Sequence, residues 1–360
     1  MSRLYAFGSN GSGQLGIGTT KDTSSPQRCL FRDIDGPPRR LSKIAAGGNH
    51  TLILNESGDL YSSGMIDDDD GRGDLESPDH PEHIFRKHYT LNSKLLFCAA
   101  LWEASVLVTG GENIYAKGKG PKGELGTGAV ISPQWQRLLT FPPSGTHIVD
   151  VASGVAHTVI ILSNGEAYGW GNGRKGQLGE PPQIVETPRK IQNLGFRVMR
   201  AVCGREFTYF VGEATEGRHV ICGSSKWNVN SDAPSAVQNW IDLGASWGSI
   251  YVLKTDGKII SWGRNDHGQL APPGLPNIKH IAVGSEHVLA LTTAGAVLTW
   301  GWGEHGNCGL QTDKAGDVID RWNEIHLEDE VDAQVVGVGA GCATSFIWVK
   351  TIYKEEFRED

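Results

Sequence analysis

Short apolar stretches, many of them alternating with small or polar residues, recur along the chain and end at a glycine. Four of these stretches stand in equivalent places and predict β-strands: Leu4–Phe7, Ala167–Trp170, Ile259–Trp262 and Val297–Trp300. The dipeptides Asn164-Gly165 and Asp256-Gly257 lie between such stretches and supply the positive φ that hairpin turns need. No unit contains an amphipathic helix of about 10–15 residues, which parallel βαβ units require. The pattern therefore predicts an all-β protein built from short antiparallel strands.

A second regularity follows these strands. A glycine is followed six positions later by Gln, Glu or Asn, and then in most copies by Leu-Gly. The five copies are Gly8–Gly16, Gly118–Gly126, Gly171–Gly179, Gly263–Leu270 and Gly301–Gly309. Two further copies are degraded. After Gly64 the spacing grows to ten positions, and after Gly223 the motif is lost.

Another phrase lies between these copies: an apolar strand, a glycine, and a polar or aromatic residue three places further on. It occurs at Ile44–His50, Val151–His157, Val202–Phe207, Val283–His287 and Val338–Thr344, with weaker copies around Leu101 and Ser246. The strand ends near positions 47, 101, 154, 204, 246, 284 and 341 define seven units. Repeats of this size made of short strands predict a seven-bladed β-propeller.

The two ends of the chain fall inside one unit. The chain begins with the later phrase and ends with the earlier one, so we expect the unit opened at the C-terminus to be completed by the N-terminus. This predicts a ring closed by pairing of the N- and C-terminal strands, near Tyr5 and Phe346. The expected organisation is a single propeller over residues 1–349, with insertions at about 65–94 and 310–334, and a charged C-terminal tail at 350–360.

These phrases resemble the repeats of the regulator-of-chromosome-condensation family, whose fold is a seven-bladed propeller, over nearly the whole chain. Three segments resemble the fungal alpha-tubulin suppressor branch of that family more closely: Tyr5–Gly11, Trp300–Gly309 and Gly341–Thr344. This resemblance implies a non-enzymatic propeller that pairs with a small CSL-type zinc-ribbon protein of the diphthamide pathway, and through it with Elongator subunits. It also implies support for two modifications, of the wobble uridine of tRNA by Elongator and of elongation factor two by diphthamide synthesis.

Composition narrows the classes of partner. Glycine accounts for 48 of 360 residues, while the net charge is −8 and the pI is about 5.8. Because phosphate neutralisation needs a basic surface, strong direct binding to nucleic acid is disfavoured. The longest apolar runs, such as Leu95–Leu101, are far too short to cross a membrane, and the N-terminus does not read as a signal peptide. Six scattered cysteines without a Cys-x-x-Cys pair favour a reducing compartment. The location that we expect is the cytoplasm, with the nucleus as a second location.

The histidines favour structural roles. His50, His157 and His287 share one repeat position, and we expect each imidazole to tie its own tight turn through backbone hydrogen bonds. His80, His83 and His88 lie with Asp79 and Glu82 beside the acidic run Asp67–Asp70, where a solvated insertion is favoured over a metal site. Neither a nucleophile elbow nor a phosphate-binding loop is found. We therefore expect no cofactor, no metal and no catalytic residues.

Tryptophan suggests a binding surface. Trp170, Trp262 and Trp300 end equivalent strands and are expected to pack between blades, whereas Trp102, Trp247 and Trp302 are expected in loops. In an antiparallel blade, the turn after the first strand and the loop after the third share one face. The partner-binding residues predicted on this face are Trp102, Glu103, Arg205, Glu206, Trp247, Glu286, His287, Trp302, Glu304 and His305. The alternative is that some of them plug the central channel or pack between blades.

Two functions remain after these exclusions. The first is a scaffold or regulator that binds a small protein; the second is a nucleotide-exchange factor for a small GTPase, by analogy with the founder of the family. The charge of −8 and the lack of a basic arm before the first strand weigh against exchange on chromatin. An enzyme with a site at the channel mouth is the least favoured class, since no acid/base pair stands out.

Overall fold

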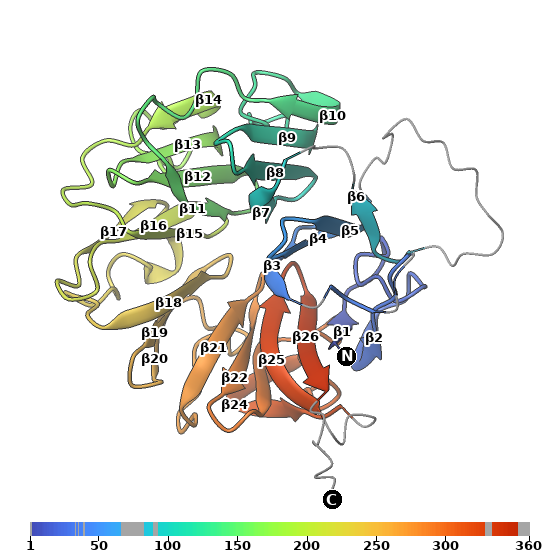
Figure 1. The fold of residues 1–360 in the computed structure, drawn as a ribbon. Coiled ribbons are helices and arrows are strands. Elements are labelled where there is room, and N and C mark those ends of the chain that lie inside the picture. The colour runs from blue at the N-terminus through green and yellow to red at the C-terminus, as the bar shows by residue number, and fades with distance from the viewer. Residues whose placement is uncertain are drawn as a thin grey trace, which may run out of the picture.

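Seven antiparallel sheets follow one another in sequence order around a common centre (Figure 1). The computed structural model describes residues 2–32, 34, 36–38, 40–65, 83–88, 93–327 and 333–351. Within these residues the sole helical element is a short 3-10 turn, η1 (Lys226–Asn228). The innermost strands contact each other from blade to blade, and the last contacts the first, so the ring is closed. The seven-bladed β-propeller predicted from the repeats is confirmed.

We number the blades along the chain, each from its innermost strand. Blade 1 contains β3 (Leu41–Ala46), β4 (His50–Asn55), β5 (Leu60–Gly64) and β6 (Arg86–His88). Blade 2 contains β7 (Leu95–Ala100), β8 (Ala104–Thr109), β9 (Ile114–Lys119) and β10 (Ile131–Arg137). Blade 3 contains β11 (Ile148–Ser153), β12 (His157–Leu162), β13 (Ala167–Asn172) and β14 (Ile184–Lys190). Blades 4 and 5 contain β15 (Arg200–Cys203), β16 (Phe207–Val211) and β17 (His219–Gly223); and β18 (Trp240–Ala245), β19 (Ser249–Lys254) and β20 (Ile259–Gly263). Blade 6 contains β21 (Ile278–Val283), β22 (His287–Thr292), β23 (Val297–Trp302) and β24 (Asp317–Ile325). Blade 7 contains β25 (Ala333–Ala340), β26 (Thr344–Thr351), β1 (Ser2–Gly8) and β2 (Thr23–Arg28).

Blades 4 and 5 have three strands rather than four. In blade 5 the segment after β20 contains Pro272, Pro273 and Pro276, which cannot donate to a strand ladder. In blade 4 the segment after β17 contains η1 instead of a strand. Both segments therefore remain as loops and leave side chains free for other contacts.

Blade 7 is assembled from both ends of the chain. β1 pairs antiparallel with β26, with Tyr5 opposite Ile347 and Ala6 opposite Phe346. Since β26 pairs with β25 on its other side, the N-terminal strand occupies the third position of the blade. The predicted closure by terminal strands is confirmed.

The repeated tryptophans join neighbouring blades. Trp170 and Trp300 are completely buried, and Trp262 is nearly so. Each indole donates its Nε1 hydrogen to a backbone carbonyl of the preceding blade, at 2.9 Å for Trp170 to Glu124, 2.9 Å for Trp262 to Val229 and 3.0 Å for Trp300 to Gln269. The predicted packing between blades is therefore confirmed for all three.

The repeated glutamine and leucine fold the loop that follows the third strand. The Gln177 side-chain oxygen accepts a hydrogen bond from the Lys175 backbone N–H at 2.9 Å, and Gln269 does the same for His267 at 2.9 Å. The following leucine is buried in most copies, as Leu178 is in blade 3. The side chain of the polar residue thus accepts a hydrogen bond from the backbone of its own turn. This contact explains why the polar residue follows the first glycine by six positions in the five copies.

The shared histidines join blades rather than closing their own turns, so that prediction is wrong. His50 Nε2 lies 2.8 Å from Ser105 Oγ, and His157 Nε2 lies 2.9 Å from Thr208 Oγ1. His287 Nε2 lies 3.0 Å from Ser345 Oγ in blade 7. In each pair the hydroxyl belongs to the next blade. The turns themselves are closed by backbone hydrogen bonds, so the imidazole is free to reach across.

Parts of the predicted insertions lie outside the described residues. These parts include Asp67–Asp70, Asp79, His80 and Glu82. Residues 310–334 contain β24, which pairs with β23 as the outer strand of blade 6. In the described ranges no group of three or more His, Cys, Asp and Glu side chains is placed to hold a metal ion, and no helix is long and apolar enough to span a bilayer.

Candidate functional site

One end of the propeller collects the turns between first and second strands together with the loops after third strands. Backbone hydrogen bonds join the two within a blade: Trp302 N donates to Glu286 O at 2.9 Å, and Arg264 N donates to Gly248 O at 2.9 Å. We call this end the loop face. The predicted partner-binding residues all come from its turns, loops and adjoining strand ends.

Two tryptophans meet at the mouth of the central channel on this face. The channel has a volume of about 460 Å³ and is lined by the innermost strands of all seven blades. Trp102 of blade 2 and Trp247 of blade 5 come from opposite sides, and their ring centroids are 6.1 Å apart with planes inclined at 42°. Trp102 is still 40 % exposed. The pair therefore narrows the channel and also presents aromatic surface to solvent.

Charged side chains surround this pair. The Arg205 guanidinium carbon lies 5.1 Å from the centroid of the Trp247 ring, and Arg205 N donates to Trp247 O at 3.2 Å. Glu103 is exposed and approaches Lys119 at 4.0 Å, while Glu206 is half-buried. The structure thus brings these predicted residues from blades 2, 4 and 5 to one region of the loop face.

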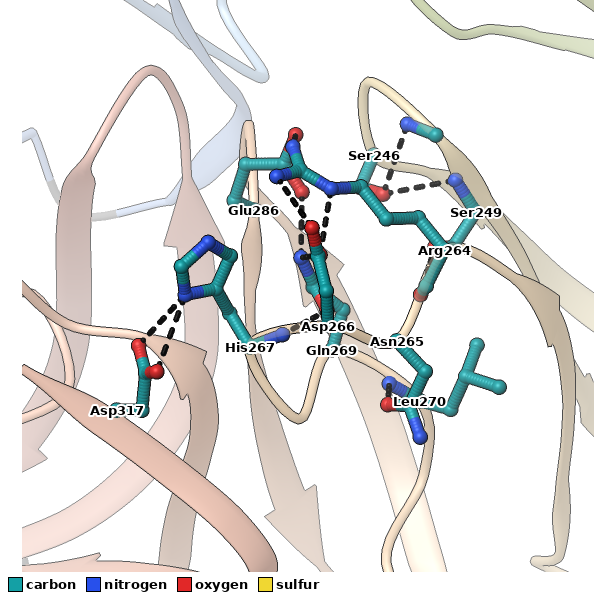
Figure 2. Close-up of polar contacts among 11 residues, drawn as sticks. Ser246, Ser249, Arg264, Asn265, Asp266, His267, Gln269, Leu270, Glu286 and Asp317 are labelled. Atoms are coloured by element: carbon teal, nitrogen blue, oxygen red, sulfur yellow. Dashed lines mark hydrogen bonds and ion pairs between the residues drawn. The ribbon is translucent and has the colours of Figure 1, made fainter. Parts of the chain in front are cut away.

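The loop of blade 5 and the turn of blade 6 together form a polar cluster that is only partly accessible. Arg264 donates from Nη1 to Glu286 Oε1 at 2.6 Å, and from Nε and Nη2 to the Asp266 carboxylate at 2.6 and 2.9 Å (Figure 2). Gln269 Nε2 donates to Glu286 Oε2 and to Asp266 Oδ1, both at 3.0 Å. One arginine and one amide therefore hold two carboxylates in a fixed arrangement.

Two of the residues predicted to bind a partner are not at the surface, so the prediction is wrong for them. Glu286 is 2 % exposed and His287 is completely buried. Glu286 is held by Arg264 and Gln269, and His287 contacts the hydroxyl of Ser345. Both lie at or next to the start of β22, the second strand of blade 6, where the loops cover them. The turn before β22 is on the surface, but these two side chains are buried.

Of the remaining predicted residues of blade 6, Trp302 is packed against a neighbouring ring, whereas Glu304 and His305 are exposed. Trp302 is the last residue of β23 rather than a loop residue, and its ring stacks on His267 with centroids 4.7 Å apart and planes 12° apart. His267 Nδ1 in turn lies 3.0 Å from both Asp317 oxygens (Figure 2). Glu304 and His305 are exposed, and His305 Nδ1 lies 2.9 Å from Asp22 Oδ2 of blade 7.

Burial and ion pairing set the charge of this cluster. Burial raises the pKa of Glu286, although Arg264 opposes the shift. Burial also acts to raise the pKa of Asp266, but hydrogen bonds from Arg264 and Gln269 outweigh it and lower that pKa. One arginine thus contacts both carboxylates, of which Glu286 is buried and Asp266 is exposed.

Sequence reasoning missed Trp227, Arg264, Asp266 and His267. Arg264, Asp266 and His267 lie inside a recognised copy of the glycine-led phrase, whose variable positions the repeat does not constrain. Trp227 lies in the degraded copy after Gly223, in η1. The repeat carries no signal that singles out the blade 5 residues, because other copies have large or charged side chains at the same positions, such as Lys119, Arg174 and His305.

Comparison with known proteins agrees with this geometry. The family model described as the RCC1-like domain matches residues 3–347. The chain belongs to the RCC1-like domain family. An RCC1 repeat-containing protein of Schizosaccharomyces pombe is 32 % identical to this RCC1-like chain, over 98 % of this chain and 100 % of that protein.

Other members of the RCC1-like family differ in size and role. The E3 ubiquitin-protein ligase HERC2 of Homo sapiens is 29 % identical over 80 % of this chain, but the chain spans only 6 % of HERC2. The crystal structure of Prp20p from Saccharomyces cerevisiae, described with its binding to Gsp1p and histones, superposes with a TM-score of 0.78 at 21 % identity, covering 98 % of this chain and 92 % of Prp20p. This structural likeness establishes the shared propeller fold.

Proposed function

We propose that this RCC1-like propeller is a non-enzymatic scaffold that binds a small CSL-type zinc-ribbon protein. Through that partner it supports Elongator-dependent modification of the tRNA wobble uridine and diphthamide synthesis on elongation factor two. The identity of the partner rests on the resemblance of Tyr5–Gly11, Trp300–Gly309 and Gly341–Thr344 to the fungal alpha-tubulin suppressor branch. The proposed locations are the cytoplasm and the nucleus.

The observation that carries the binding role is the contact between Trp102 and Trp247. Two large rings at a channel mouth, one of them 40 % exposed, are typical of the anchors that dominate protein interfaces. Arg205 lies beside them and is exposed, and arginine is the other residue enriched among such anchors. Binding is favoured over catalysis because the buried Glu286 and the exposed Asp266 are both already held by Arg264 and Gln269.

Calorimetric titration of the purified chain with the purified zinc-ribbon protein tests the proposal. Loss of one aromatic anchor costs about 2–4 kcal/mol, so Trp102→Ala and Trp247→Ala are each expected to weaken binding at least tenfold. Leu139→Ala is the matched control, because Leu139 is 72 % exposed and follows β10 at the opposite end of the propeller. Thermal unfolding of each variant is measured in parallel.

Two further variants separate interface from packing. Trp302→Ala is expected to lower the melting temperature, since its ring stacks on His267. Glu304→Ala removes an exposed carboxylate that has little packing to lose, so a change in affinity there reports on the interface. Unchanged affinity in folded Trp102→Ala, Trp247→Ala and Glu304→Ala would move the partner to another surface. Acceleration of nucleotide release from a small GTPase by catalytic amounts of the chain would replace the proposal with an exchange factor.

A further inference from the structure

A third exposed tryptophan extends the aromatic surface away from the channel mouth. Trp227 is 39 % exposed and belongs to η1 in blade 4. Its ring lies against Gly248, the residue after Trp247, because a Cβ at Gly248 would be 3.0 Å from Trp227 Cδ1. At the other end of the row, a Cβ at Gly48 would be 2.6 Å from Trp102 Cδ2. Glycine at both positions lets the rings lie directly on the turns, and Trp102, Trp247 and Trp227 form what we call the tryptophan stripe.

The backbone holds Trp227 in an unusual conformation. Trp227 and Asn228 have φ of 62° and 59°, so two consecutive residues other than glycine are left-handed. Such conformations are unfavourable for residues other than glycine and persist where the surroundings impose them. Here they direct a large apolar ring toward the surface of the loop face.

Cations accompany the rings of the stripe. The Lys226 ammonium and the Arg264 guanidinium carbon each lie 4.8 Å from the centroid of Trp227, and Arg205 lies over Trp247. Arg264 is engaged by Glu286 and Asp266. Arg205 and Lys226 are exposed and make no ion pair with any residue in the described part of the chain. Their charged donors therefore face solvent beside apolar ring surface.

We propose that the tryptophan stripe binds an acidic segment of the partner protein. Carboxylates of that segment accept hydrogen bonds from Arg205 and Lys226, and an apolar side chain packs on the exposed parts of Trp102 and Trp227. This inference rests on the proposed function, and it names the chemistry that the partner presents to this part of the loop face. Hydrogen bonds between charged groups are about twice as strong as neutral ones, so the two cations give the stripe its selectivity.

The arrangement favours an acidic protein segment over a nucleic acid. Bases bind aromatic platforms by stacking on a free ring face. Trp247 and Trp227 already carry a cation over their rings, and Trp102 and Trp247 are too close together to admit a base between them. The exposed parts of Trp102 and Trp227 thus lie beside the cationic donors of Arg205 and Lys226, an arrangement that suits aliphatic groups and carboxylates. A protein with a net charge of −8 repels acidic molecules at long range, so selectivity comes from these local contacts.

Charge reversal tests the proposal with the zinc-ribbon protein as ligand. Arg205→Glu and Lys226→Glu are each expected to weaken binding at least tenfold in calorimetry, whereas Lys226→Arg stays within threefold of the unaltered chain. The matched controls are Lys314→Glu, an exposed lysine of blade 6 on the same face, and Lys258→Glu at the opposite end, both expected within twofold. Full affinity in Arg205→Glu and Lys226→Glu would overturn the stripe proposal and leave the proposed function intact.

A second measurement examines the stripe without that partner. The indole N–H signals of ¹⁵N-labelled protein are followed during titration with a 15-residue peptide rich in Asp and Glu around a central leucine. The signals of Trp102, Trp227 and Trp247 are expected to shift, and a peptide with Lys in place of the acids is expected to leave them unchanged. Absence of these shifts overturns the stripe proposal. This result does not depend on the zinc-ribbon protein, so it tests the stripe even if that protein does not bind and the proposed function is rejected. Larger shifts with single-stranded oligouridine than with the acidic peptide would overturn it in favour of a nucleic acid.

Discussion

Arg264 connects the loop of blade 5 to the turn of blade 6. It holds the nearly buried Glu286 with one nitrogen and the more exposed Asp266 with two others. A carboxylate that loses its only cation inside a protein pays the full cost of leaving water, unless it takes up a proton. We therefore expect Arg264 to contribute more than Gln269 to the stability of this part of the loop face, because it supplies the positive charge.

Arg264→Ala is expected to lower the free energy of unfolding by about 3 kcal/mol, because Glu286 is left buried without a cation. Chemical denaturation at neutral pH measures the loss. Arg174→Ala is the control, since Arg174 is exposed and makes no ion pair with a described residue; its effect is expected to stay within about 0.5 kcal/mol. A loss below about 1 kcal/mol for Arg264→Ala would mean that Gln269 alone suffices to hold Glu286.

Single side chains show where sequence reasoning ends. The buried roles of Trp170 and Trp300 follow from their repeat position. The hydroxyl partner of His157, Thr208, did not follow from the repeat. The three hydroxyl residues do share a repeat position, since Ser105, Thr208 and Ser345 are each the second residue of their strand, whereas the histidines are the first residue of theirs. The hydroxyl is about fifty residues away in the chain, and only the order of the blades in space brings it close. Trp227 was missed for the opposite reason, because it stands where the repeat has been lost.

Strands that begin with these histidines form bridges between three pairs of blades. β4, β12 and β22 each start with an imidazole that contacts a hydroxyl of the following blade. At the equivalent position of β16, Phe207 packs in a core cluster with Ile250 instead. A polar bridge is compatible with burial only while the imidazole is neutral, which makes these three interfaces sensitive to acid.

Burial lowers the pKa of His50, His157 and His287 to about 4. The unfolded chain binds protons with a pKa of about 6.5, so stability is complete above that pH and declines as the pH falls toward 4. We expect a loss of about 1 kcal/mol per histidine between pH 7.5 and 5.5, measured by urea denaturation. His157→Gln is expected to show a shallower decline than the unaltered chain. Equal slopes in the two proteins would contradict the assignment.

The ring as a unit depends on β1. β1 lies between β26 and β2, so its removal leaves two strands of blade 7 without their neighbour. An unpaired strand edge in a half-assembled blade is a site for aggregation. The terminal phrases of the sequence were sufficient to predict this closure, because strand pairing within a blade is set by the repeat. They did not predict the loop face in detail, because its side chains come from the variable positions of different blades.

Deletion of Met1–Gly8 is expected to lower the melting temperature markedly and to cause aggregation on heating. Differential scanning calorimetry and light scattering record the two effects. As a control, a synthetic peptide of residues 1–10 is added to the shortened chain and is expected to restore part of the melting temperature, because it can occupy the vacant position beside β26. A melting temperature that does not change on deletion would show that pairing with β1 contributes nothing to closure.

The position of β1 also has a consequence for synthesis on the ribosome. β1 is translated before blades 1 to 6, yet its partner β26 begins only at Thr344. At about 5–20 residues per second, the N-terminal strand remains unpaired for tens of seconds while blades 1 to 6 are translated. During that interval the nascent chain exposes an apolar strand with a free edge, so we expect it to engage chaperones until β26 has emerged. Slow codons late in the message would lengthen that exposure, and a circular permutant that begins at Leu41 would abolish it.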